Sequence, residues 1–204
     1  MTPPTDALPL HVRQATPDDL DVVVELHHNA YHWLIARGII DQWPGPFPPH
    51  AIQELIRRRQ VHVASRGNSA IATFTLSYRP DPELWDDPPD NAGYIRRLVV
   101  DHKHAGHDLG GQLLDHASKL VAATGRPWLR LDCAKHNTRL HDYYRAHGFT
   151  HLRTIDLPHR QSGALFQRPA TPSHGEAHAA GAPADTASRR TSAAAGPIAT
   201  RFRI

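Results

Sequence analysis

The 204-residue chain has one cysteine, no long hydrophobic run and no block of charge of one sign. The single cysteine, Cys133, excludes a disulfide within the chain and is typical of a protein from a reducing compartment. No apolar run approaches the roughly 18 residues that a bilayer-spanning helix needs. The first ten residues have no basic stretch followed by an apolar core, so no secretory signal is expected. These absences predict a cytoplasmic protein with no membrane partner.

Charged residues of both signs are interspersed along the chain. The 23 basic and 20 acidic residues give a formal net charge of +3, without the Lys/Arg blocks that typify nucleic-acid binding. Nucleic acid is therefore not an expected partner. The 17 histidines stand out, because they can raise the positive charge below about pH 6.5, where free histidine titrates.

Composition changes sharply near Pro169. Residues 170–204 are mostly Ala, Gly, Pro, Ser, Thr and Arg, with few large apolar side chains. Such a segment cannot bury enough surface to offset the entropy lost on ordering. The sequence thus predicts a domain over residues 10–169 and a low-complexity, disordered tail over 170–204.

The domain alternates strand-like and helix-like patterns. Strands are predicted over 10–13, 61–65, 70–78, 94–100, 128–133, 149–157 and 164–168. Helices are predicted from an N-cap at Thr16, over 50–59, from Leu109 to Gly125, and over 137–147 before Gly148. This order predicts an α/β domain with a mixed sheet.

Residues 99–116, VVDHKHAGHDLGGQLLDH, join an apolar strand to an amphipathic helix through a short glycine-bearing loop. The first turn of a helix leaves backbone N–H groups unpaired, and the helix dipole adds partial positive charge there. That arrangement suits a phosphate group. The segment therefore predicts a phosphorylated ligand, and the alternative is a tight turn without a ligand.

Two segments together resemble the GNAT superfamily of acyl-CoA-dependent N-acyltransferases, over roughly residues 10–169. Residues 96–117, RRLVVDHKHAGHDLGGQLLDHA, are similar to the family's strand, pyrophosphate loop and helix. Residues 129–149, LRLDCAKHNTRLHDYYRAHGF, are similar to its next strand and helix. The resemblance implies a mixed, mostly antiparallel sheet flanked by helices. It also implies a split between the strands at 94–100 and 128–133, in which the acyl-pantetheine arm lies.

The resemblance further implies acetyl-CoA as co-substrate and assigns residues to it. Backbone groups at the end of the first strand, Leu98, Val99 and Val100, would bind the pantetheine amides. The pyrophosphate would be held by Ala105, Gly106, His107, Asp108, Leu109, Gly110 and Gly111. Asn137 matches an Asn beside the pantetheine arm, and Tyr144 a Tyr near the CoA sulfur. Asn137 is equally suited to cap a helix, and either Tyr144 or its neighbour Tyr143 could be a packing residue.

The implied chemistry is direct attack of a neutral primary amine on the thioester. A backbone N–H near Val100 would stabilise the negative charge that develops on the carbonyl oxygen. Tyr144 would protonate the leaving thiolate as a general acid. No covalent enzyme intermediate is needed, so Cys133 is not expected to be a nucleophile.

The pyrophosphate loop departs from the family pattern. Ala105 stands where the family has Arg or Gln, and Asp108 stands where it has Gly. A carboxylate repels a pyrophosphate and fills space that glycine leaves open. Lys103, His104 and His107 would offset the charge, or Asp108 would point outward. The alternative is a non-catalytic acyl-CoA-binding or interaction module with a degenerate loop.

The general base is left open by the sequence. Many family members carry Glu on the strand that here spans 94–100, and this chain has none there. The candidate bases are Asp86, Asp87, Asp90, Asp132 and His136, and a bound water is an equal alternative.

The acceptor is expected to be a small-molecule or peptide-like primary amine. Its site would be built from 31–47, 85–90 and the hairpin at 149–168. Trp43, Phe47 and Trp85 would form a partly apolar wall there, and the alternative is that they cap the core. An alternative acceptor is a protein or a charged tRNA. No metal is expected, because His102, His104 and His107 lack an HExxH-type pair or a matching Cys set. A homodimer stays open, since edge strands in this fold often pair between subunits.

Overall fold

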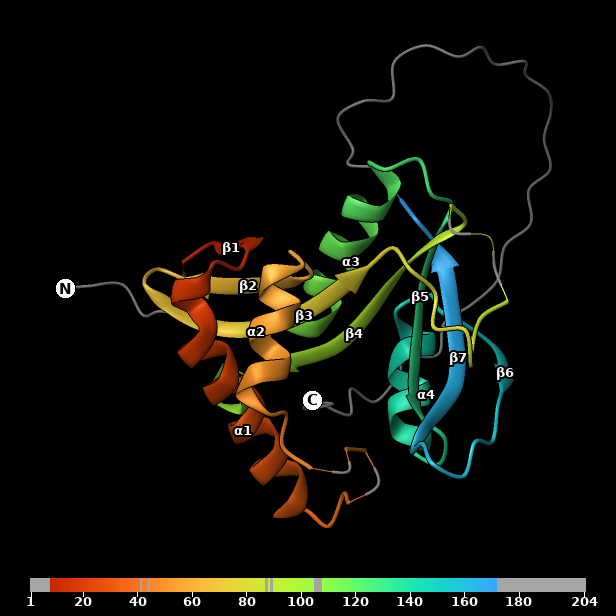
Figure 1. Ribbon diagram of the computed structural model, residues 1–204, viewed down its shortest axis with the longest axis horizontal. Helices are drawn as coiled ribbons and strands as arrows, with labels where there is room; N and C mark the ends of the chain where they lie inside the picture. Colours follow the sequence, from red (N-terminus) through yellow and green to blue (C-terminus); the bar gives the residue numbers. More distant parts are fainter. Residues whose placement is uncertain are drawn as a thin grey trace, which may run out of the picture.

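The computed structural model describes residues 8–40, 42–43, 45–86, 88, 90–104 and 108–171. The elements are β1 (Leu10–Gln14), the 3-10 turn η2 (Pro17–Asp19), α1 (Leu20–Ile35), α2 (Pro49–Arg57), β2 (Val61–Arg66), β3 (Ser69–Ser77), β4 (Ala92–Val100), the 3-10 turn η3 (His102–His104), α3 (Leu109–Ala122), β5 (Trp128–Ala134), α4 (Thr138–Ala146), β6 (Thr150–Thr154) and β7 (Ser162–Pro169) (Figure 1). Of the predicted tail, residues 172–204 lie outside the described residues. None of the helices in the described ranges is long and apolar enough to cross a bilayer.

The seven strands form one sheet in the order β1-β2-β3-β4-β5-β7-β6. Every neighbouring pair is antiparallel except β4 and β5, which are parallel. In Figure 1, α1 and α2 lie in front of the sheet and α3 lies behind it. The predicted mixed, mostly antiparallel sheet flanked by helices is confirmed.

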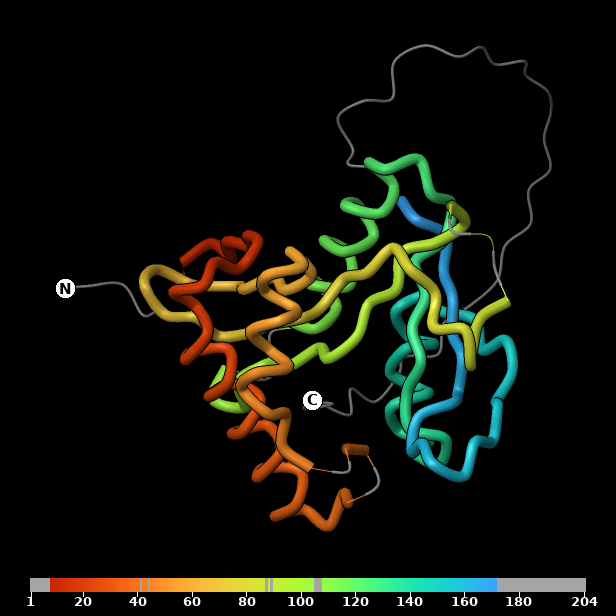
Figure 2. Tube along the Cα trace, in the orientation of Figure 1, coloured from red at the N-terminus to blue at the C-terminus, as the bar shows by residue number. Residues whose placement is uncertain are grey.

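The strands β4 and β5 pair only near their amino ends. Their register joins Ala92 to Trp128, Gly93 to Leu129 and Tyr94 to Arg130. Both strands continue for several residues without further pairing to each other, and they diverge toward their carboxyl ends (Figure 2). The described chain therefore contains the split predicted between these two strands.

The strand β4 carries a bulge at the edge of this split. Its register with β3 passes from Thr73–Val99 to Thr75–Arg96, so β4 has one residue more than β3 over this stretch. Arg97 adopts a φ of +52°, in the left-handed region that non-glycine residues rarely enter. A bulge redirects side chains along a strand. Here it brings both Arg97 and Leu98 to the wall of a cavity in the split.

Hydrophobic clusters on the two faces of the sheet hold these parts in place. The predicted apolar stripe of α3 is buried against β3, β4, β5 and β7, with Leu113, Leu114, Ala117 and Val121 fully covered. On the other face, residues of α1 and α2 pack against β2. Burial of these apolar stripes follows directly from their helical spacing.

The ends of the helices confirm most of the predicted caps. Thr16 forms a capping box with Asp19, although the first turn is a 3-10 turn. Asn137 caps α4 by accepting a hydrogen bond from the Leu140 N–H at 3.0 Å. At the far end of the domain, the Ala170 N–H bonds Pro127 and the Thr171 N–H bonds Ser118, so the described domain continues past Pro169.

Candidate functional site

A cavity of about 360 Å³ lies in the split between β4 and β5. Its wall comprises Gln42, Trp43, Phe47, Arg96, Arg97, Leu98, Asp132, Cys133, Ala134, Leu140, Tyr144, Pro158, His159, Arg160, Gln161 and Ser162. These residues come from the α1–α2 loop, β4, β5, α4, the β6–β7 loop and the first residue of β7. A volume near the lower end of the range of about 300–1,000 Å³ suits a small molecule.

The free edge of β4 faces this cavity. On one side, Val99 and Val100 pair with Thr73 and Ala72 of β3. On the other side, the described register with β5 ends at Tyr94. Main-chain donors and acceptors along the end of β4 are therefore open to a strand-like ligand. Leu98 lines the cavity, and Leu98, Val99 and Val100 together border a second, smaller hollow beside α1.

Tyr144 lies on α4 and borders the cavity. Its ring packs between Phe149 and Phe166, with centroid separations of 5.8 and 5.9 Å. Burial raises the pKa of its hydroxyl well above the ordinary value. The phenol is therefore protonated in neutral solution, as a proton donor must be.

The neighbouring Tyr143 has a different position. Its ring packs on His147 at a centroid separation of 4.4 Å, and its hydroxyl covers Gly110 so closely that a Cβ there would collide with it. Tyr143 is absent from the described cavity wall. Of the two tyrosines, the structure thus brings Tyr144 to the split and uses Tyr143 in packing.

The segment that follows β4 contains the predicted pyrophosphate loop. Ala105, Gly106 and His107 lie outside the described residues. Asp108 directly precedes α3 with φ +49° and ψ +37°, a left-handed conformation that Asp tolerates better than most residues. This conformation explains why a glycine suits the position.

The Asp108 side chain is 64% exposed, and its Oδ1 lies 3.3 Å from His147 Nε2. A Cβ on Gly111 would collide with the Asp108 carboxylate, so this carboxylate lies over the first turn of α3. The expected alternative in which Asp108 points outward, away from the pyrophosphate, stays a prediction, because residues 105–107 of the loop lie outside the described residues. Leu109, the next residue, is buried in the core.

Asn137 joins the two sides of the cavity. Its Oδ1 caps α4, and its Nδ2 donates to Gln42 Oε1 of the α1–α2 loop at 3.2 Å. Both polar groups of its side chain thus have partners in the described structure. A contact with a ligand amide would replace the Gln42 bond and leave the cap intact.

Of the proposed bases, Asp132 alone is found in the wall described above. Asp86 and Asp90 are 94% and 95% exposed and pair with Arg153 and Arg126 respectively. His136 is exposed outside the described cavity wall. Asp87 lies outside the described residues.

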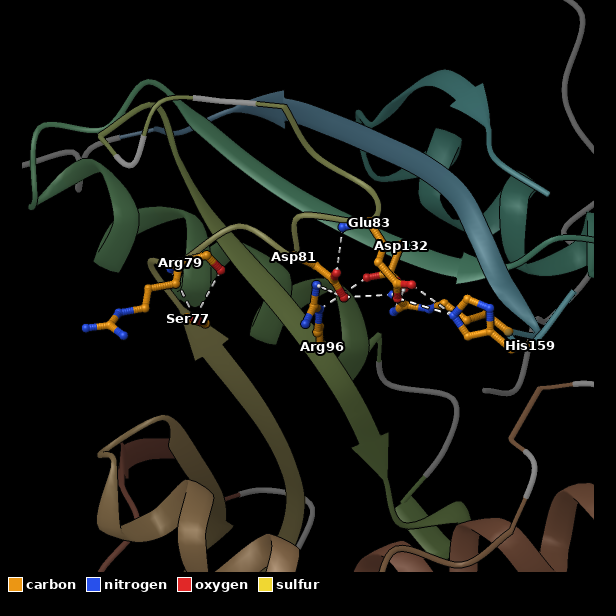
Figure 3. A network of polar contacts seen from close by, with 8 residues as sticks. Ser77, Arg79, Asp81, Glu83, Arg96, Asp132 and His159 are labelled. Carbon is orange, nitrogen blue, oxygen red and sulfur yellow. Dashed lines mark hydrogen bonds and ion pairs between the residues drawn. The ribbon is translucent and has the colours of Figure 1, made fainter. Parts of the chain in front are cut away.

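Two arginines and two aspartates form a closed ring of ion pairs at the cavity wall, here called the Arg–Asp ring (Figure 3). Arg96 Nε lies 3.2 Å from Asp132 Oδ1, and Arg96 Nη2 lies 3.4 Å from Asp81 Oδ2. Arg160 Nη1 lies 2.8 Å from Asp81 Oδ2, and its Nη2 lies 3.9 Å from Asp132 Oδ2. The ring ties β4 and β5 to the β3–β4 and β6–β7 loops.

Charge pairing in the Arg–Asp ring affects the ionisation of Asp81. Burial favours the protonated acid, but the hydrogen bond from Arg160 and the nearby charges outweigh it and hold the pKa of Asp81 below its ordinary value. Asp81 and Arg160 were not identified from the sequence, because the four members of the ring lie in four separate segments.

His159 is a third residue that was not identified from the sequence. Its Nε2 lies 3.0 Å from Glu83 Oε1, and its side chain borders the cavity (Figure 3). An imidazole held by a carboxylate has the arrangement of a general base. His159 therefore joins Asp132 as a candidate.

The expected aromatic wall is correct in part. Trp43 and Phe47 border the cavity and contact each other edge to face, with centroids 5.6 Å apart. Trp85 is only 3% exposed and packs on Tyr94 in a separate core cluster, so its expected place in the wall is wrong. Its backbone N–H bonds the Asp81 carbonyl oxygen, and this turn directs the indole inward.

Cys133 also borders the cavity but is not activated. Burial, followed by the nearby Asp132 charge, raises the pKa of its thiol to about 12. The thiolate is the nucleophilic form of cysteine, and it is scarce at neutral pH with such a pKa.

Comparison with known proteins places these features in one family. Residues 27–149 match the acetyltransferase (GNAT) family. An uncharacterized N-acetyltransferase of Bacillus subtilis (strain 168), YesJ, is 29% identical over 142 residues, which is 66% of this chain and 78% of that protein. A GNAT-family acetyltransferase from Listeria monocytogenes 4b F2365 has a TM-score of 0.69 at 25% identity, covering 79% of this chain and 95% of that one.

The fold is shared more widely. The PaiA N-acetyltransferase from Thermoplasma acidophilum, solved in complex with coenzyme A, has a TM-score of 0.62 at 16% identity. The match covers 79% of this chain and 99% of that one. The family match spans more than half of the chain and contains both motifs, the split sheet and Tyr144. The chain therefore belongs to the GNAT acetyltransferase family.

Proposed function

We propose that this protein is an acetyl-CoA-dependent N-acetyltransferase that acts on a small primary amine by direct attack. The observation that carries the proposal is the cavity in the split, whose wall includes Leu98 at the free edge of β4 and the partly buried Tyr144. The coenzyme A in the PaiA complex supports acetyl-CoA as the co-substrate.

The N-terminal side of the split would bind the co-substrate. Main-chain groups of Leu98, Val99 and Val100 would bond the pantetheine amides. The loop and helix start at 105–111 would receive the pyrophosphate. Asp108 opposes that binding by charge, whereas Lys103 and His104 of η3 and the dipole of α3 favour it.

The C-terminal side of the split would supply the proton transfers. A base takes a proton from the acceptor ammonium, and the neutral nitrogen then forms the new C–N bond. A main-chain N–H near Val100 stabilises the oxyanion. As the C–S bond breaks, Tyr144 donates its proton to the sulfur and is reprotonated from the excess proton on the amine nitrogen.

Two residues are candidates for the base, and their positions differ. Asp132 lies in the Arg–Asp ring and faces two guanidinium groups. His159 is held by Glu83 at the outer part of the wall and is 60% exposed. A water between either residue and the amine is the third route. The pH dependence of kcat in Asp132→Asn and His159→Gln distinguishes them. Substitution of the true base should abolish the ascending limb of the pH profile.

The alternative is an acyl-CoA-binding module without catalysis. It is favoured by the Asp108 carboxylate over the first turn of α3 and by the lack of Glu on β4. Calorimetry with acetyl-CoA, CoA and a longer acyl-CoA tests binding, and release of CoA in the presence of a panel of amines tests turnover. Micromolar binding with turnover supports the enzyme. Binding without turnover of any amine supports the module, and absence of binding contradicts both.

Location and assembly are proposed from the cysteine content and the strand order. The single cysteine supports a cytoplasmic location. The edge strands β1 and β6 would be the pairing surfaces of a homodimer. Sedimentation of the full chain tests the dimer.

A further inference from the structure

Arg97 places a guanidinium group in the wall of the acceptor cavity. The residue sits at the β4 bulge with a φ of +52°, and its guanidinium carbon lies 5.0 Å from the centre of the Phe47 ring. Leu98, the next residue, borders the same cavity as Tyr144. The cation is therefore held by a strained strand position and an aromatic ring.

Arg97 differs from the other arginines of the cavity in having no carboxylate partner among the described residues. Arg96 and Arg160 are both neutralised within the Arg–Asp ring. Within the described ranges, no carboxylate lies within ion-pair distance of the Arg97 guanidinium, and its Nε is buried without a hydrogen-bond partner. A half-buried cation without a carboxylate partner and a buried donor without an acceptor are both costly, so the site favours an anionic ligand with acceptor atoms.

The surroundings do not remove this charge. Burial, with a smaller contribution from Arg96, lowers the pKa of Arg97, and the Asp132 charge opposes this without forming an ion pair with it. A guanidinium with an ordinary pKa of 12.5 stays protonated at neutral pH. The neighbouring His27 does not supply a second cation. Burial, followed by the Arg97 charge, lowers the pKa of His27 to about 4.

We propose that the acceptor amine carries a carboxylate and that Arg97 binds this carboxylate. A guanidinium presents two parallel N–H groups that match the two oxygens of a carboxylate. Trp43 and Phe47 border the same wall and would contact an apolar part of an amino-acid-like acceptor. The inference rests on the proposed acetyltransferase function, since it assigns the other end of the acceptor to Tyr144 and the thioester.

Binding of product analogues tests this inference in the full-length protein saturated with CoA. The probes are the N-acetyl-L-amino acids, each compared by calorimetry with its uncharged amide, such as N-acetyl-L-leucine and N-acetyl-L-leucinamide. We expect the preferred carboxylate to bind at least about tenfold tighter than its amide, the size of a charge-assisted hydrogen-bonded pair.

Variants assign that preference to one residue. Arg97→Gln removes the charge and leaves a shorter polar side chain, and it is expected to bring the carboxylate-to-amide affinity ratio within about twofold. Arg97→Lys keeps the charge and is expected to keep part of this ratio. Arg57→Gln is the control: it removes an exposed arginine of α2 and is expected to retain the full carboxylate-to-amide affinity ratio. Gln, Lys and Arg meet the same backbone strain at a positive φ, so the unfolding midpoints of the three proteins should match. If Arg97→Gln fails to fold, the carboxylate-to-amide affinity ratios of Arg97→Lys and the wild type are compared instead.

Several outcomes overturn the inference. They are equal binding of carboxylate and amide, no binding of either by the CoA-loaded protein, and a ratio that persists in Arg97→Gln. Preferred turnover of 2-aminoethyl phosphate over every amino acid would also overturn it, because the anion would then be a phosphate. If uncharged amines are acetylated as fast as amines that carry a carboxylate, the inference about Arg97 is overturned but the acetyltransferase function stands. Failure to bind acetyl-CoA contradicts the proposed function itself.

Discussion

The two sides of the split contribute to the site in different ways. The side built from β1–β4 and α3 presents backbone groups at the free edge of β4 and the first turn of α3, together with the side chains of Arg96 and Arg97. The side built from β5, α4 and the β6–β7 loop presents side chains, among them Tyr144, Asp132 and His159. The difference separates binding from chemistry. Substitutions on the first side should change affinity or stability, and substitutions on the second should change turnover.

The largest expected effect comes from Tyr144→Phe on the side-chain side of the split. Loss of the proton donor should lower kcat on the order of 100-fold, with little change in the Kd for CoA, because acid catalysis typically contributes that much. Steady-state kinetics and calorimetry measure the two quantities. Tyr143→Phe is the matched control and should retain most of the activity. An unchanged rate in Tyr144→Phe would remove the residue from the mechanism.

A second prediction concerns stability on the backbone side, through the ion pair of Asp19 with Arg13. Their atoms approach to 2.7 Å, and the hydrogen bonds from Arg13 are the main cause that lowers the pKa of Asp19 from 3.8 to about 2. That shift corresponds to about 2 kcal/mol of unfolding free energy, an upper value because Arg13 is half exposed.

The sign of the pH dependence follows from the lowered pKa. The Asp19 contribution is complete above the unfolded pKa of 3.8 and is lost as the pH falls from there toward 2. We expect Asp19→Asn to lower the unfolding free energy at pH 7 and to converge with the wild type on acidification to pH 2. Urea denaturation followed by circular dichroism measures this, with the exposed Asp142→Asn as control. A constant difference across this pH range would contradict the assignment.

A third prediction sharpens the role of the backbone side in binding. Asp108→Gly removes a carboxylate from the first turn of α3. It also relieves the strain of a left-handed backbone conformation, which costs roughly 1–2 kcal/mol for a residue with a Cβ. We expect about tenfold tighter binding of CoA, a somewhat higher unfolding midpoint and a smaller change in kcat. Asp108→Asn separates charge from strain, since it removes only the charge. Weaker binding by the glycine variant would mean that Asp108 helps to hold the loop or the ligand.

The smallest expected effect is that of Cys133→Ser, on the side of the split that carries the chemistry. Its thiol has a pKa of about 12, and direct attack needs no enzyme nucleophile. Turnover should stay within about twofold of the wild type, with no burst of acyl-enzyme. A loss of activity comparable to that of Tyr144→Phe, or a trapped acyl-cysteine in mass spectrometry, would contradict direct transfer.

Local patterns in the sequence were sufficient for most of the fold. The stripe of Leu113, Leu114, Ala117 and Val121 has helical spacing and is buried as predicted. Thr16 and Asn137 cap helices for the same local reason, because each cap needs only neighbouring residues. The predicted strand 149–157 is shorter in the structure, where β6 ends at Thr154 and the loop to β7 contains a turn at Pro158 and His159.

The candidate site was only partly predictable. Tyr144 and Leu98 belong to contiguous motifs, and they meet at the cavity as the resemblance implies. Their roles stay predictions until variants are measured. Arg160 and His159 gave no signal, because a loop residue becomes part of a site only through partners distant in the chain. Trp85 was misplaced for the converse reason: its aromatic character suits a wall or a core equally well.

The sequence by itself determined the order of strands and helices, the motif segments and the family, because these depend on short-range periodicity and on spacing along the chain. The tertiary structure decided which charged groups are paired. Arg96 and Arg97 are adjacent in sequence, yet one lies in the Arg–Asp ring and the other lies beside Phe47 without a described carboxylate partner. The bulge at the left-handed Arg97 separates the two, and a one-residue irregularity of this kind is fixed by strand register across the sheet.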